Sequence, residues 1–156
     1  MSALMNAVAS SDPSSAAVPR LEGLIRFPTG LLGFPDVSQY RLLQGPGAGL
    51  YWLSGTEPGD PSFLLSDPFV YFGGLSLDLP PASVDQLEAN EASDVAVLAV
   101  TVPDTDTGTW TANLQGPVVV NVSKGLGAQI VLPDQSLGVR RAFRPNPELV
   151  GSADSR

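Results

Sequence analysis

Residues 21–34 decide how this chain folds, and they read Leu21-Glu22-Gly23-Leu24-Ile25-Arg26-Phe27-Pro28-Thr29-Gly30-Leu31-Leu32-Gly33-Phe34. In the first half of this stretch, residues 21, 23, 25 and 27 alternate with Glu22, Leu24 and Arg26, which is the pattern of a half-buried β-strand. Pro28 ends the strand because its ring fixes φ and it has no amide hydrogen to donate to a ladder. The stretch therefore begins with a strand that has one face in a core.

The second half has the form F-P-x-G-x-x-G-F and predicts a tight corner. Gly30 and Gly33 can adopt positive φ, so the chain can fold back there, and Phe27 and Phe34 can both be buried beside the turn. A corner that starts a β-barrel accounts for the motif. The alternative is a loop that displays Leu31 and Leu32 to a partner. It is not a phosphate loop, because no Gly-Lys-Ser/Thr follows.

The rest of the folded region is dominated by short strand patterns separated by Gly and Pro. Residues 95–102 are nearly continuously apolar and β-branched, as expected for a strand covered on both faces. We expect further strands at residues 37–43, 50–53, 62–65, 117–122 and 128–132. Many short strands favour a mostly β fold, a small β-barrel or sandwich with a single short helix.

That helix is expected near Ser83. Ser83 and Gln86 have the spacing of a capping box, and Asp85 and Glu88 would lie near the N-terminal end, where negative charge is favoured. Pro80-Pro81 should prevent an earlier start.

Both ends of the chain are expected to be flexible tails. Residues 1–19 are rich in Ser and Ala without periodicity, and residues 144–156 begin with Arg-Pro-Asn-Pro. We therefore place the β domain at residues 20–143.

Composition removes several function classes. The chain has no His and no Cys, which excludes Ser-His-Asp and Cys-His nucleophile systems, disulfides and Cys/His zinc sites. The remaining carboxylates and hydroxyls show no spacing that selects a catalytic pair. No apolar run approaches the roughly 20 residues that span a bilayer, and residues 1–19 are unlike a secretory signal. We expect a cytoplasmic protein without enzymatic activity or cofactor.

Charge is concentrated in the middle of the chain. Residues 42–123 contain ten Asp or Glu and no Lys or Arg, within a total net charge of −8. An acidic surface repels phosphate, so nucleic acid is not an expected partner, whereas a basic protein is. Solubility alone explains the acidity equally well at this stage.

Residues 67–72, Asp-Pro-Phe-Val-Tyr-Phe, combine a turn signal with three aromatic side chains. Such a cluster is most often core, and it also suits an apolar interface anchor ringed by acids. The candidate partner-binding residues are Asp67, Tyr71, Phe72, Asp78, Asp85, Glu88 and Glu91.

Two polar segments have structural interpretations. Asp104-Thr105-Asp106-Thr107-Gly108 resembles the start of a calcium loop but lacks its later ligands, so a hairpin or surface loop is preferred. Residues 111–121 look like a polar turn that leads into a buried strand after Pro117, with Asn113 and Asn121 bonding to nearby backbone.

Taken together, these motifs resemble the flagellar assembly factor FliW family. The resemblance is carried by residues 25–34, 63–72, 94–102, 111–121 and 129–132, in the family's order and spacing. The F-P-x-G-x-x-G-F element with a downstream T-A-N-L and P-V-V-x-N is the specific part. Of the basic stretch that often follows in the family, only Lys124 is present here.

The resemblance implies a small β-barrel-like fold, no enzymatic activity and a role in bacterial flagellum biogenesis. It implies binding to CsrA, a small RNA-binding repressor of flagellin translation, and chaperone-like binding to flagellin, which would compete for the factor. Export of flagellin would free the factor to bind CsrA and relieve repression. The alternative class is a β-sandwich module that binds calcium or carbohydrate.

Overall fold

The computed structural model describes residues 22–90 and 94–145, which fold around one continuous β-sheet. The predicted tails at residues 1–19 and 144–156 therefore lie outside the described residues, except for Arg144 and Pro145. The strands are β1 (Gly23–Arg26), β2 (Gln39–Gln44), β3 (Leu50–Gly55), β4 (Ser62–Ser66), β5 (Ala96–Val102), β6 (Trp110–Ala112), β7 (Val118–Asn121), β8 (Leu126–Gln129) and β9 (Arg141–Phe143). The helices are α2 (Pro68–Tyr71), α3 (Pro81–Gln86) and the 3-10 turn η3 (Gln135–Leu137).

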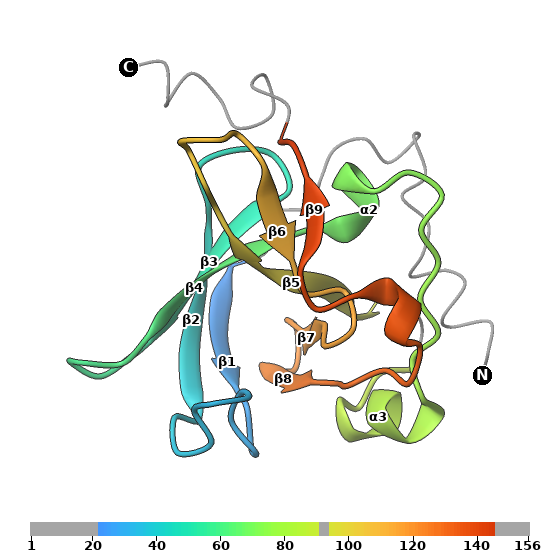
Figure 1. Cartoon of the computed structure of the whole chain (residues 1–156). Coiled ribbons are helices and arrows are strands. Elements are labelled where there is room, and N and C mark those ends of the chain that lie inside the picture. Colours follow the sequence, from blue (N-terminus) through green and yellow to red (C-terminus); the bar gives the residue numbers. More distant parts are fainter. Residues whose placement is uncertain (1–21, 91–93, 146–156) are drawn as a thin grey trace.

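Seven of the strands close into a barrel (Figure 1). Their order is β4-β3-β2-β1-β8-β7-β5, and pairing between β4 and β5 completes the ring. The barrel pairings are antiparallel except between β1 and β8. β6 and β9 extend the sheet beyond β5. The mostly β prediction is confirmed as a barrel rather than a sandwich.

Two strands were missed by the sequence patterns. β6 falls in the segment predicted as a polar turn, and β9 lies next to the predicted C-terminal boundary. Each has three residues, too few to show a period of two, and they pair with each other from Trp110–Phe143 to Ala112–Arg141. The strand expected at residues 128–132 instead begins at Leu126.

Inside the barrel lies a core built from the alternating residues of the first strands. Ile25, Tyr40, Leu42, Tyr51 and Leu53 are fully buried there. The Phe27 ring packs edge-on against Tyr40, with ring centres 5.4 Å apart. Inward-facing and outward-facing residues thus alternate along these strands, as the alternation of apolar and polar residues in the sequence predicted.

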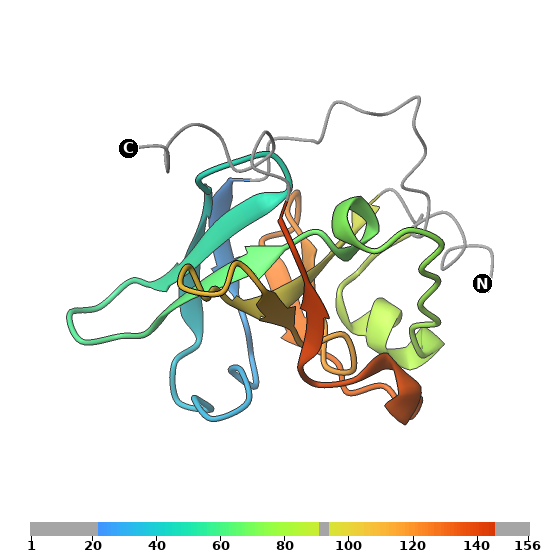
Figure 2. The same ribbon diagram turned by 45° about the horizontal axis from the view of Figure 1, so that its top comes forward.

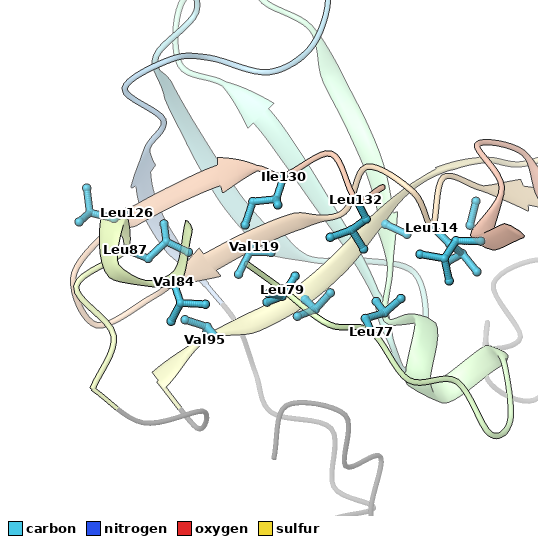
Figure 3. Close-up of a cluster of buried hydrophobic side chains, with 14 of the residues drawn as sticks. Leu77, Leu79, Val84, Leu87, Val95, Leu114, Val119, Leu126, Ile130 and Leu132 are labelled. Carbon is cyan, nitrogen blue, oxygen red and sulfur yellow. The ribbon is translucent and has the colours of Figure 1, made fainter. Parts of the chain in front are cut away.

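A second core lies outside the barrel, between its wall and the segment that carries α3 (Figure 3). Leu77, Leu79, Val84 and Leu87 from that segment pack with Val119 and other residues of the sheet. Strand β5 serves both cores, since Leu98 faces the interior cluster while Val97 and Ala99 face the outer one. This explains the continuous apolar run at residues 95–102.

The F-P-x-G-x-x-G-F corner lies beside the shortest strand pairing of the barrel, that of β1 with β8. β1 and β8 are in register only at Arg26 and Leu126, with Arg26 N donating to Gly125 O at 2.8 Å. The corner reinforces this seam, because Leu32 N donates to Gln129 Oε1 at 2.9 Å and Gln129 Nε2 donates to Gly116 O at 2.9 Å. Gly127 of β8 lies beneath the Phe27 ring, where an added Cβ would be 2.6 Å from ring carbons.

Both glycines of the corner adopt positive φ, as expected: +70° at Gly30 and +87° at Gly33. Phe27 is buried, but the expectation that Phe34 is buried too was wrong, because Phe34 is 39% exposed. Its ring contacts Phe63 at the barrel end, with centroids 5.6 Å apart. Pro28 is exposed after the end of β1, and Pro117 is buried, with its carbonyl accepting from Ile130 N at 2.9 Å.

The predicted helix exists but starts earlier than expected. α3 begins at Pro81 with Pro80 at its N-cap, and no side chain caps it, so the Ser83–Gln86 capping box was wrong. Proline is favourable at the first helical position because that amide needs no partner. As a result, Asp85 lies in the last turn and Glu88 lies beyond the helix, at the end where the dipole disfavours negative charge. α2 is a second helix that the sequence patterns missed.

Candidate protein-interaction surfaces

Asp67, predicted as part of an acidic rim, is a helix cap. Its carboxylate accepts from Phe69 N at 2.9 Å at the start of α2. Burial raises the pKa of this carboxyl above 3.8, and the hydrogen bonds from the Phe69 and Val70 amides only partly oppose that shift. The Asp67 carboxylate is therefore poorly suited to attract a basic partner from a distance, because it is partly buried and already accepts hydrogen bonds from the backbone of α2.

Tyr71 and Phe72 form an aromatic cluster with the last strand. Their ring centres lie 5.1 and 5.2 Å from that of Phe143 in β9, and the Arg141 guanidinium lies 5.9 Å from the Phe72 ring centre. Tyr71 also donates to Ala48 O at 2.9 Å. Both aromatic side chains are half-buried against the outer core, so the core interpretation describes most of their contacts.

The exposed acidic candidates gather around α3 rather than around α2. Asp78, Asp85 and Glu88 are all exposed, and Glu88 Oε1 lies 3.8 Å from Lys124 Nζ. α2 and α3 lie on the same side of the molecule, at opposite ends of the segment that joins them (Figure 2). The structure thus separates the aromatic pair from the acidic group, and Glu91 lies outside the described residues.

Asn113 and Asn121 are structural, as their sequence context predicted. Asn113 Oδ1 accepts from the amides of Gln115 and Gly116 at 3.1 and 2.9 Å. Asn121 is buried, and its Nδ2 donates to Leu87 O at 2.8 Å, which fastens the end of α3 to β7.

The loop that resembles a calcium site is a β5–β6 connection. Asp104 Oδ1 accepts from Asp106 N at 3.1 Å and Thr107 N at 3.3 Å, so the carboxylate shapes the turn. Among the described residues no group of three carboxylates is arranged to hold a metal ion. Within those ranges, no helix is long and apolar enough to cross a membrane.

The structure also presents a surface that the sequence patterns did not single out, on the outer side of β1, β2 and β3. Leu24, Leu43 and Trp52 are exposed there by 48, 39 and 40%, beside the exposed Arg26 and Arg41. We call these five residues the open face. One feature of the sequence could have revealed this surface: Leu24 is apolar although it occupies an outward-facing position of its strand, where polar residues are expected. Leu43 and Trp52 likewise adjoin residues that point inwards.

The described residues thus form a small closed β-barrel with a second core outside it. Its exposed acidic and apolar surfaces are suited to binding other proteins, so the fold is that of a small protein-binding β-barrel. The FliW protein family model matches residues 15–143. A FliW crystal structure superimposes with a TM-score of 0.72 at 31% identity, covering 79% of this chain and 86% of that one.

Two curated relatives extend the comparison. The flagellar assembly factor FliW of Natranaerobius thermophilus is 37% identical over 111 residues, covering 70% of this chain and 74% of the relative. That of Symbiobacterium thermophilum is 30% identical over 138 residues, 87% of this chain and all of the relative. The chain belongs to the FliW family of flagellar assembly factors.

Proposed function

We propose that this protein is a non-enzymatic cytoplasmic regulator of flagellum assembly that binds a CsrA-type translational repressor and, in a chaperone-like way, flagellin. The observation that carries the proposal is the FliW match, which runs through the whole barrel and its outer layer. Flagellin and the repressor compete for the factor. Export of flagellin leaves the factor free to bind the repressor, and translation of flagellin resumes.

The charge of the α3 side supports the repressor as a partner. A protein that holds RNA needs a basic surface, and Asp78, Asp85 and Glu88 offer exposed carboxylates to one. Asp78 and Asp85 are the better steering charges, because Glu88 is already near Lys124.

Binding kinetics test this proposal. Charges at an interface rim act mainly on association rate, so the Asp78→Lys/Asp85→Lys variant should bind purified CsrA with about tenfold slower association at low salt. The difference should shrink as salt rises, because exposed charges are screened over about 8 Å at physiological ionic strength. Glu57→Lys, in the exposed β3–β4 turn, changes a charge outside the α3 side and is the control.

Three results would count against the proposal. Absence of any complex with CsrA or flagellin would refute the function itself. An association rate that changes neither with the charge reversal nor with salt would show that CsrA binds elsewhere on the protein. Direct binding of flagellin leader RNA without CsrA would contradict the expected lack of a nucleic-acid surface.

A further inference from the structure

The five residues of the open face point to the same side of the sheet. Leu24 is directly opposite Arg41 in the β1–β2 register, and Leu43 is directly opposite Trp52 in β2–β3. Directly opposed residues, and residues two apart on one strand, share a face. The intervening residues Ile25, Leu42 and Leu53 are fully buried in the barrel, so the open face is the outer one.

Only the β3 end of this side of the sheet is covered among the described residues, where Leu50 is buried with Leu64 beside Tyr71 and Trp110, whereas the open face itself has no covering layer there. On the other half of the barrel, the outer sides of β5, β7 and β8 are covered by α3 and the segments around it. Both ribbon views place α3 and β9 on that half, away from β1 and β2 (Figures 1 and 2). Three large apolar side chains grouped on an uncovered sheet are typical of an interaction site.

The charge of the open face is opposite to that of the molecule. The chain carries −8, yet the four strands β1 to β4 contain no Asp or Glu. Arg26 and Arg41 are exposed, and neither lies within ion-pair distance of a carboxylate in the described part of the chain. Glu22 immediately precedes β1, two residues from Leu24, and is the one acid that borders the open face in the described part of the chain, since the next acids, Asp36 and Glu57, lie in connecting loops. An apolar surface with two guanidinium groups that have no carboxylate partner in residues 22–90 and 94–145 complements an apolar segment flanked by carboxylates.

We propose that the open face is the docking surface for an apolar, carboxylate-flanked segment of flagellin. The assignment rests on the proposed function, which supplies two partners. CsrA must be basic to hold RNA, so Arg26 and Arg41 repel it, whereas the acidic α3 side attracts it. Flagellin is then the partner whose segment the open face receives, with Trp52 as the largest apolar anchor. Its competition with CsrA is therefore between partners on separate faces, where one bound protein hinders the other, and not for one shared surface.

Charge reversal tests the arginines. The Arg26→Glu/Arg41→Glu variant of the full chain should bind purified flagellin at least about tenfold more weakly, because each guanidinium would be replaced by a repelling carboxylate. Its affinity for CsrA should not fall. Arg140→Glu/Arg144→Glu reverses two exposed arginines outside the open face, so it is the control with the same change in charge and should leave flagellin affinity unchanged. Thermal unfolding of each variant checks that the barrel is intact.

Fluorescence tests the place of contact independently of affinity. The chain has two tryptophans, and Trp110→Phe leaves Trp52 as the only one. Trp52 is 40% exposed, so a segment seated on it should shift its emission to shorter wavelength and protect it from acrylamide, after subtraction of the spectrum of free flagellin.

The outcomes separate the two proposals. If the wild-type chain binds no flagellin, the proposed function fails and this inference with it. If flagellin binds, but the arginine reversal leaves its affinity unchanged and the Trp52 emission does not shift, this inference alone is wrong. Loss of CsrA affinity in the arginine variant would also overturn it, because the open face would then receive the repressor.

Discussion

At the scale of single residues, the two glycines of the corner motif have the same conformation but different surroundings. Gly30 is buried, and an added Cβ would lie 2.5 Å from Phe34 O and 2.7 Å from Pro35 Cα. Gly33 is exposed, and an added Cβ would meet nothing within 4 Å. The sequence shows two equivalent glycines, whereas the fold makes one of them irreplaceable.

We therefore expect Gly30→Ala to destabilise the protein more than Gly33→Ala. Positive φ alone costs an L-residue about 1 kcal/mol, which is the expected loss at Gly33. At Gly30 the backbone clash adds to this, giving about 2–4 kcal/mol. Urea unfolding of both variants measures the difference. Equal losses would show that the corner relaxes around the added methyl group, and unchanged stability with abolished partner binding would make the glycines contact residues.

Asp67 gives a second residue-scale prediction, for pH dependence. Its raised pKa means that the folded protein holds the proton more tightly than the unfolded chain does. The free energy of unfolding therefore falls as pH rises from about 3.8 through the folded pKa. Asp67→Asn keeps an acceptor for Phe69 N but cannot ionise, so the variant should gain stability relative to wild type over that interval. Urea unfolding across acidic to neutral pH measures the gain, and a pH-independent difference would contradict it.

At the scale of elements, sequence periodicity predicted those strands whose burial is one-sided or complete. β1 to β5 and β7 were found because their residues alternate or run continuously apolar over several positions. β6 and β9 are too short to show a period and depend on pairing with each other. The sequence prediction starts α3 too late, because Pro80-Pro81 does not prevent the helix: Pro81 is its first residue.

The interaction surfaces were less predictable for a physical reason: they depend on which strands become neighbours. The open face unites β1, β2 and β3, and only the register reveals that Leu43 and Trp52 are opposed. Gln129 joins the corner to the start of β7, and although residues 129–132 contribute to the family resemblance, nothing in the sequence predicts these hydrogen bonds.

Asn121 provides the element-scale prediction, because it holds α3 to the barrel. Asn121→Ala removes the buried donor to Leu87 O and leaves that carbonyl unsatisfied at the helix end, which should cost about 1–3 kcal/mol. Amide hydrogen exchange should accelerate in α3 more than in the barrel strands. Asn113→Ala is the control, since the hydrogen bonds that it removes are part-buried and do not involve α3. Equal exchange in α3 for both variants would mean that apolar packing alone holds the helix.

At the scale of the whole molecule, the interior core and the outer core lie on opposite sides of the same sheet. Tyrosine side chains pack in or against both cores, so their ionisation shows whether each core stays closed to water. Tyr40 and Tyr51 are fully buried in the barrel, and Tyr71 lies between the outer core and the small cluster of Leu50 and Leu64. Burial raises the pKa of all three phenols above 10.0, and that of Tyr71 reaches about 12, with the Asp67 carboxylate adding to the shift at Tyr51 and Tyr71. Because these are the chain's only tyrosines, no phenol of the folded protein should titrate at its ordinary pKa.

The alkaline titration of the protein should therefore coincide with its unfolding. The folded state holds these protons more tightly than the unfolded chain, so stability is fully present below pH 10.0 and is lost as pH rises through the folded pKa values. Tyrosinate absorbance and the loss of β-sheet circular dichroism should rise together, well above pH 10.0. In urea, the same absorbance should appear near the ordinary value of about 10. A tyrosine that ionises near pH 10.0 while the circular dichroism is intact would show that one of the cores admits water without unfolding of the barrel.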